Sequence, residues 1–244
     1  MYPRRSLIIL GLLTFLASLV AFVPARLAIA VLPVPPALKI VDPAGSLWHG
    51  QARIATVHGQ YAVSWDLQAW RLLLLGLGGS WQVSATDMSA QGHLILRPWA
   101  LELRINQGEL AGSRLARIFS GPGMTIDQPL RLQGVAISAA WRGEAISAQG
   151  RCAWGPGSVQ VANRPAPLAV PALRGQFAVA DGKFRLVVDG EPAPGQTLAT
   201  ADADFRADEM HLVILQRAAE MVGWLGKGQR PPDTPFIELR QPLR

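Results

Sequence analysis

The residue types that could carry chemistry are few and widely spaced in this chain. The four histidines, at positions 49, 58, 93 and 211, never stand two or four residues apart, the spacings that bring two imidazoles together for a metal. Gly182-Lys183 looks like the end of a phosphate-binding loop, but the position five residues before Gly182 is Phe177 rather than a glycine. The sequence therefore predicts no catalytic residue, no cofactor and no metal site, and we expect a protein that is not an enzyme.

Acidic side chains gather near the C-terminal part of the chain. Asp202, Asp204, Asp208 and Glu209 stand within eight residues, and alternation on a strand would place Asp202 and Asp204 on one face. Calcium binding is one interpretation, but the loop glycine and the glutamate at the twelfth position of a calcium loop are missing. A solvated strand edge protected by charge is the interpretation we favour.

The net charge of +6 invites a search for a nucleic-acid site. Arg4, Arg5 and Arg26, with no acid before residue 33, supply half of that charge. The other basic residues are scattered, and no run of five occurs, so we expect no nucleic-acid partner. The single cysteine, Cys152, excludes an intramolecular disulfide and is expected to be a small buried hydrophobe.

An uncharged apolar stretch near the N-terminus predicts a transmembrane helix. Residues 6–23 carry no charge, and at about 1.5 Å per residue they nearly cross a hydrocarbon layer of about 30 Å. The basic excess on their N-terminal side places residues 1–5 in the cytoplasm and the rest of the chain outside it. A cleaved signal peptide ending at Ala28-Ile29-Ala30 is the alternative, but Pro24 and Arg26 separate that site from a long apolar core, which favours a retained anchor.

The remainder of the chain divides by composition into three segments. Residues 24–40 are expected to form a Pro-rich spacer, because the prolines of Leu32-Pro33-Val34-Pro35-Pro36 stiffen and extend the backbone. Residues 41–226 form the predicted β-rich domain. Residues 227–244 contain four prolines and are expected to be an extended tail.

Apolar residues alternate with polar ones over most of residues 41–226, which predicts antiparallel strands with one buried face. The alternation is clear over residues 57–67, 81–86, 101–106 and 130–141, and Gly134 interrupts the last of these where a bulge is expected. Ala180-Asp181-Gly182-Lys183 separates two alternating runs and predicts a hairpin.

Three stretches depart from this alternation. Residues 112–119 have apolar side chains at helical spacing, and so do residues 208–225, although a strand over residues 210–215 is an alternative for part of the second stretch. The run from Leu72 to Leu75 is expected to be a short buried strand, and a partner-facing patch is the alternative.

Tryptophan is unusually common, with eight residues against two tyrosines. Trp48, Trp65, Trp70, Trp81, Trp99 and Trp141 mostly fall on apolar strand positions, so packing in the core is the first interpretation. The alternative is a one-sided groove or partner face that would take acyl chains or a partner strand. Its candidate residues are Tyr61, Val63, Trp65, Leu67 and Trp81.

A short element follows the predicted spacer and reads Gly45-Ser46-Leu47-Trp48-His49-Gly50. Gly45 and Gly50 bracket it at positions typical of a turn or bulge, so that Leu47 and Trp48 can plug one end of the sheet. We favour a folding role for Trp48 over direct contact with a partner.

The layout of the chain resembles a known family. A short Arg-bearing end, one membrane span, a Pro-rich spacer, the element at residues 45–50 and then a strand carrying Trp65 are similar to type II secretion system protein N, the general secretion pathway accessory protein of Gram-negative bacteria. Ser46 stands where this family more often has threonine. The family is in turn similar to the AsmA-like group, whose curved β-sheets form an apolar groove associated with lipid transport.

The resemblance implies a fold, a location and partners. The fold is mainly β: one N-terminal transmembrane helix, then a curved antiparallel β-sheet domain in the periplasm with one or two short helices. The protein would be a single-pass component of the bacterial inner membrane that supports export of folded proteins across the outer membrane. Its partners would be other inner-membrane or periplasmic secretion subunits and the lipid bilayer, and an apolar groove would add acyl lipids.

Overall fold

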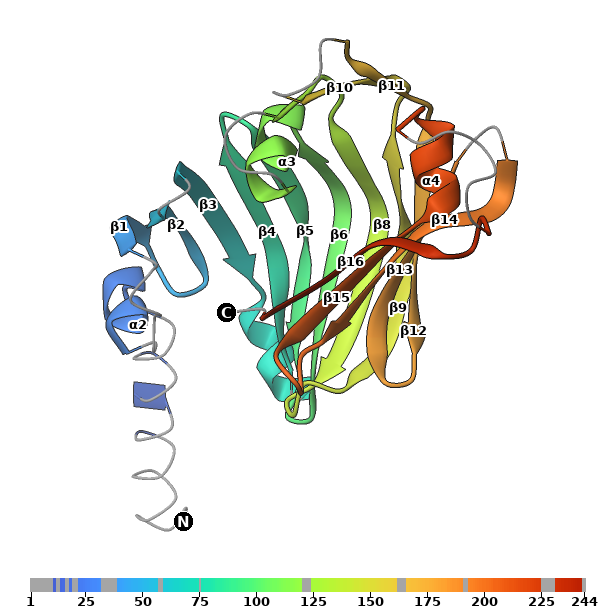
Figure 1. Ribbon diagram of the computed structural model, residues 1–244. Helices are drawn as coiled ribbons and strands as arrows, with labels where there is room; N and C mark the ends of the chain where they lie inside the picture. The colour runs from blue at the N-terminus through green and yellow to red at the C-terminus, as the bar shows by residue number, and fades with distance from the viewer. Residues whose placement is uncertain are drawn as a thin grey trace. The chain divides into compact units, whose positions relative to one another are not determined.

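The protein is rich in antiparallel strands and forms two units (Figure 1). The computed structural model describes residues 11, 14, 15, 18, 22–31, 39–56, 59–74, 76–119, 124–161, 166–190, 193–224 and 231–242. Unit 1 is Met1–Ala85 and unit 2 is Thr86–Arg244. The predicted fold class, mainly β with antiparallel sheet and few short helices, is confirmed.

Unit 1 contains an antiparallel sheet in the order β1-β2-β3-β4, whose strands are β1 (Lys39–Gly45), β2 (His49–Thr56), β3 (Gly59–Leu67) and β4 (Leu77–Ala85). The helix α2 (Ala25–Val31) packs on β1, and the 3-10 helix η1 (Ala69–Leu74) links β3 to β4. Residues opposite each other in neighbouring strands share a face of the sheet, so Trp65 beside Trp81 and Val63 beside Val83 form one apolar face.

Unit 2 contains a larger antiparallel sheet and a small second sheet. The larger sheet runs in the order β5 (Met88–Leu96), β6 (Ala100–Leu110), β8 (Leu130–Ala140), β9 (Ala145–Trp154), β12 (Leu173–Ala180), β13 (Lys183–Gly190), β14 (Ala193–Asp204), β15 (Glu209–Leu215) and β16 (Pro235–Pro242). The small sheet has the order β11 (Leu168–Val170), β10 (Gly157–Val161) and β7 (Met124–Ile126).

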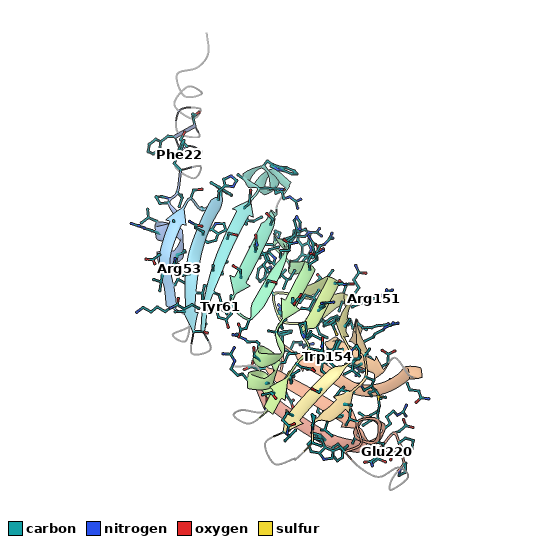
Figure 2. The ribbon with its side chains drawn as sticks, turned by 90° about the horizontal axis from the view of Figure 1, so that it is seen from above. Phe22, Arg53, Tyr61, Arg151, Trp154 and Glu220 are labelled. Carbon is teal, nitrogen blue, oxygen red and sulfur yellow. The ribbon has the colours of Figure 1, made fainter. Side chains whose placement is uncertain are left out.

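Short elements gather at one end of the larger sheet. The helix α3 (Gly112–Phe119) follows β6 and packs on β7, and α4 (Gln216–Met221) contacts β14, β15 and β16. Figure 1 shows α3, the small sheet and α4 together at this end, and Figure 2 labels Trp154 and Glu220 there. The indole N–H of Trp154 donates to the carbonyl oxygen of Gln128 at 2.9 Å, which ties β9 to the segment that leads into β8.

Two predicted backbone features are confirmed in unit 2. Gly134 has φ +58° where the β8–β9 register shifts, as expected for a bulge. The hairpin of β12 and β13 turns at Asp181 and Gly182, with φ +54° and +72°, the left-handed values that a tight two-residue turn requires.

The helix predicted over residues 208–225 is wrong for its first half, where the strand alternative holds. Glu209–Leu215 is β15, and the helix α4 is limited to Gln216–Met221. The tail is more ordered than expected, because Pro235–Pro242 forms β16 and pairs with β15. Met210, Leu212 and Ile214 lie on one face of β15, and the strand forms because β14 and β16 supply partners on both of its sides.

Two N-terminal expectations meet the structure only in part. Residues 72–74 belong to η1 rather than to a strand, so that prediction was wrong. Residues 25–31 of the expected spacer form the helix α2, whereas residues 32–38 lie outside the described residues.

The predicted transmembrane span, residues 6–23, lies outside the described residues except for positions 11, 14, 15, 18, 22 and 23. Within the part of the chain that the structure describes, every helix is too short or too polar to cross a bilayer.

Candidate interaction surfaces

The element at residues 45–50 forms a tight turn between β1 and β2. The Ser46 Oγ accepts hydrogen bonds from the backbone N–H groups of Trp48 (3.2 Å) and His49 (3.1 Å), and the Ser46 N–H donates to the carbonyl oxygen of His49 at 2.8 Å. Threonine carries the same oxygen on Cβ, so serine and threonine are equivalent caps for this turn.

The same turn ties three parts of unit 1 together. The Leu47 N–H donates to the carbonyl oxygen of Val23 at 2.9 Å, the Leu47 carbonyl oxygen accepts from the Trp65 indole at 3.0 Å, and Trp48 is buried at 7% exposure. Gly50 lies beneath the Trp65 ring, because a Cβ there would come within 2.4 Å of a ring carbon. These contacts support a structural role for Gly45, Ser46, Leu47, Trp48, Gly50 and Trp65.

The structure places Tyr61, Val63, Trp65, Leu67 and Trp81 on one face of the unit 1 sheet, all half-buried. Figure 2 labels Tyr61 on β3. The Nε1 atom of Trp81 is buried without a hydrogen-bond partner. The five residues predicted as a groove or partner face are therefore brought together on one side of a sheet.

Core packing was the wrong prediction for half of the tryptophans considered. Trp70, Trp99 and Trp141 are 57%, 61% and 57% exposed. Trp99 and Trp141 lie in the turns after β5 and β8, just past the last apolar strand position. The neighbouring Pro98 and the pair Arg142-Gly143 are turn signals that mark both residues as lying outside the strands.

Four turns come together at the end of the unit 2 sheet opposite α3, the lower end in Figure 1. We call this the turn surface, and it consists of residues 97–99, 141–144, 181–182 and 205–208. The Trp141 indole donates to the Arg97 carbonyl oxygen at 2.8 Å, and the Ala145 N–H donates to the Gly182 carbonyl oxygen at 3.1 Å. A Cβ added at Gly143 would lie 3.0 Å from the carbonyl of Phe205, so the β8–β9 and β14–β15 turns touch.

This last contact requires the sheet to curl strongly. The β8–β9 and β14–β15 turns are separated by about four strand spacings, which is roughly 19 Å in a flat sheet. The predicted curvature of the sheet is consistent with the contact between Gly143 and Phe205 at one end of unit 2.

Two of the exposed rings of the turn surface are held in place. Phe205 is 51% exposed and stacks edge-to-face on buried Phe184, with ring centroids 5.6 Å apart. The indole of Trp141 is fixed by its bond to Arg97. Ordered, exposed aromatic side chains lose little conformational freedom when a partner covers them, so such residues are suited to binding.

The turn surface has no net charge. Its three basic residues, Arg97, Arg142 and Arg206, are matched by the three acids Glu144, Asp181 and Asp208. Long-range attraction of an anionic surface therefore does not follow from these residues, whereas apolar contact does.

The polar face of the β13–β16 strands carries ion pairs. Arg185 donates to both carboxylate oxygens of Asp202 at 2.7 and 2.8 Å, and this bond raises the pKa of Arg185. Lys183 lies 3.3 Å from Asp204, whose pKa is lowered first by a hydrogen bond from the Ala207 backbone N–H. Asp202 and Asp204 stand on β14 between two strands, so the interpretation of a strand edge protected by charge was wrong.

The pairing continues onto β15 and β16. Glu238 Oε1 accepts hydrogen bonds from His211 at 2.9 Å and from Arg240 at 3.2 Å, and these two bonds, His211 first, lower the pKa of Glu238. The acids and bases of this face neutralise one another, so we assign these ion pairs a role in holding the strands together rather than in binding a ligand.

The opposite face of the same strands is apolar and incompletely covered. One row of cross-strand neighbours runs Phe177, Leu186, Ala201, Leu212 and Leu239. Four of these side chains are half-buried, and Leu239 on β16 is 44% exposed. A face of this kind offers apolar surface to another molecule.

Comparison with known proteins identifies one family. No curated protein and no solved structure matches the chain, whereas the family described as type II secretion system (T2SS), protein N, matches residues 36–223. The match includes the element at residues 45–50, the strands β1 to β15 and the helix α4. The tail strand β16 lies beyond it. With more than half of its residues matched, this chain belongs to the type II secretion system protein N family.

Proposed function

We propose that the chain is a non-enzymatic accessory component of the type II secretion machinery that acts by binding other subunits of that machinery. Membership of the family indicates a role in type II secretion. In this proposal residues 6–23 anchor the protein in the inner membrane with the N-terminus in the cytoplasm. The chain from residue 24 onward then lies in the periplasm and supports export of folded proteins across the outer membrane.

The observation that carries the proposal is the turn surface. Trp99, Trp141 and Phe205 expose aromatic rings beside Arg97, Arg142 and Arg206, and contacts within the chain hold two of these rings, Trp141 and Phe205, in place. Tryptophan and arginine are the residue types most often found at the energetic centre of protein interfaces. The zero net charge of the surface favours a protein partner over an anionic membrane.

The test removes two exposed rings and asks whether subunits still bind. In a deletion strain complemented with full-length protein, we expect the double variant Trp99→Ala/Phe205→Ala to lose crosslinked secretion subunits from purified membranes and to release less exoprotein. Each hot-spot residue contributes about 2 kcal/mol or more, so affinity should fall at least about 30-fold.

Trp70→Ala is the matched control, because Trp70 is also an exposed tryptophan (57%) but belongs to unit 1. It should recover the same subunits as wild type. Undiminished subunit recovery and export by the double variant would refute the proposal, and so would a deletion strain that exports normally. Binding of the purified proteins to anionic lipid vesicles is measured beside this. If the double variant loses vesicle binding but keeps its subunits, the turn surface is assigned to the membrane instead.

A second candidate function, lipid handling, is favoured by the incompletely covered apolar face of unit 2. Half-buried side chains such as Leu186, Leu212 and Ile214 would lie along an acyl chain. Native mass spectrometry of gently purified full-length protein should then show bound lipid, and Leu212→Glu should remove it. A wild-type protein that carries no lipid would exclude this candidate.

A further inference from the structure

The outer edge of β16 is open and regular. One edge of β16 pairs with β15 without interruption from Glu209 opposite Pro242 to Ile214 opposite Ile237. In the described chain no strand pairs with the other edge. The two prolines stand at the ends of the strand, positions 235 and 242, so every residue from 236 to 241 keeps its backbone N–H.

The outer strand of unit 1 lacks this regularity. In β1, Asp42 has φ +51° and is followed by Pro43, and the register with β2 shifts between Val41 and Ala44. A bulge and an inserted proline are devices that keep an edge from pairing with another chain. The β16 edge has neither between Ile237 and Pro242.

The side chains of β16 are suited to pairing with a second copy of the same strand. Leu239 lies on the apolar face at 44% exposure, and its neighbours Glu238 and Arg240 point to the opposite face with side-chain exposures of 46% and 66%. Both intrachain contacts of Glu238 use Oε1, which leaves Oε2 for a further donor.

We propose that β16 pairs antiparallel with β16 of a second copy of this chain, in the register that places Leu239 opposite Leu239. In that register Glu238 of each copy lies opposite Arg240 of the other, and Ile237 lies opposite Gln241. Opposite charges directly across an antiparallel pair stabilise it, and the apolar faces of the two sheets continue on the same side.

Competing registers are less favourable. Centring the pair on Glu238 sets two carboxylates directly opposite each other, and centring it on Arg240 does the same with two guanidinium groups and shortens the pairing. Centring between two residues joins the apolar face of one copy to the polar face of the other, because directly opposite residues share a face. The Leu239 register alone combines charge complementarity with continuous faces.

This inference concerns a segment beyond the family match, since β16 begins after residue 223, and it does not depend on the proposed function. An added strand buries less area than a permanent dimer requires, so the association should be reversible, with a Kd on the order of 10 μM.

The register is tested by disulfide trapping in full-length protein in detergent solution. Directly opposite Cβ atoms lie about 4.5–5.5 Å apart, within reach of a disulfide, so Leu239→Cys should form crosslinked dimers rapidly on mild oxidation. Gln241→Cys, on the same face, is the matched control. It should not form crosslinked dimers, because the two cysteines at position 241 would lie four residues apart along the paired strands. Mixed Ile237→Cys and Gln241→Cys chains should crosslink with each other. Native Cys152 is buried, so wild type should form no disulfide-linked dimer under the same oxidation.

A charge exchange separates pairing from folding. Glu238→Arg should weaken dimerisation on the order of tenfold by sedimentation equilibrium, and the double variant Glu238→Arg/Arg240→Glu should restore it to within about threefold. Circular dichroism checks that each variant is folded. Absence of wild-type dimers at about 100 μM, failure of the double variant to restore association, or crosslinking of Gln241→Cys as fast as Leu239→Cys would overturn the proposal.

Discussion

Gly50 shows how a single side-chain position sets the packing of unit 1. Its α-carbon lies so close to the Trp65 ring that any Cβ would overlap the indole. The glycine thereby lets the ring cover the strand and reach the Leu47 carbonyl oxygen. The sequence element at residues 45–50 is thus a packing device built on contact between backbone and indole.

We predict that Gly50→Ala destabilises the protein by about 2 kcal/mol or more, because the new methyl group forces the Trp65 ring or the backbone to move. Urea unfolding followed by tryptophan fluorescence measures this change. Gly108→Ala is the control, since its nearest neighbours would lie at 3.4 Å, and it should change stability by less than about 1 kcal/mol. Equal effects of the two substitutions would contradict the role of Gly50.

Glu238 predicts a pH dependence for the β15–β16 pairing. Its pKa is lowered in the folded protein, first by His211 and then by Arg240, so its contribution is present above the ordinary glutamate pKa and is lost as pH falls through the lowered value. Glu238→Gln should therefore melt at a lower temperature than wild type near pH 7, and the difference should vanish at strongly acidic pH. A difference that is constant across this range would contradict the assignment.

At the scale of elements, the β12–β13 hairpin is the clearest case in which local sequence determines structure. Asp181 and Gly182 both adopt left-handed backbone angles, and glycine does so without a steric penalty. The alternating residues on either side then pair in register from Leu173 to Ala180. The hairpin could be predicted because its turn and its strands lie within one short stretch.

We predict that Gly182→Ala destabilises the protein by about 1 kcal/mol, because alanine is strained at φ +72° although its Cβ would meet no atom within 4 Å. Asp181→Asn is the matched change and should be nearly neutral, since asparagine tolerates this conformation well. Thermal unfolding measures both. A neutral Gly182→Ala would show that the turn relaxes without cost.

Sequence reasoning failed where a distant partner decides the structure. Leu212 and Leu215 fit a helical stripe, and Leu212 and Ile214 also fit strand alternation, so local pattern could not choose between them. The choice is made by β16, which lies about twenty residues further along and was expected to be a tail. The turn surface was missed for a related reason: local turn signals mark Trp99 and Trp141 as lying outside the strands, but which turns meet depends on strands that are far apart in the sequence.

At the scale of the whole molecule, unit 2 is built around a sheet that is charged on one face and apolar on the other. Few apolar side chains are fully buried in the described chain; Val135, Phe184 and Leu198 are among them, whereas most of the apolar face is half-exposed. The two faces of the sheet could be anticipated from alternation, but the degree to which the apolar face is covered could not, because it depends on tertiary packing.

We predict that charge is tolerated very differently at two leucines of this unit. Leu198 is 4% exposed, so Leu198→Glu should cost about 4 kcal/mol or more by leaving an unpaired charge in the interior. Leu212→Glu, on the half-exposed row, should cost about 1–2 kcal/mol because water reaches the carboxylate. Denaturant unfolding compares them, and equal large losses would show that the apolar face is closed.

The balance of three arginines and three acids on the turn surface sets how binding there responds to the medium. Interactions between exposed charges weaken as salt shortens the screening length, but contacts made by apolar rings do not. A partner that docks on Trp99, Trp141 and Phe205 should therefore bind with nearly the same affinity in dilute and in concentrated salt. The protein is proposed to work outside the cytoplasm, where the surroundings set the ionic strength. Assembly through the turn surface should therefore be insensitive to a fall or a rise in the external salt concentration.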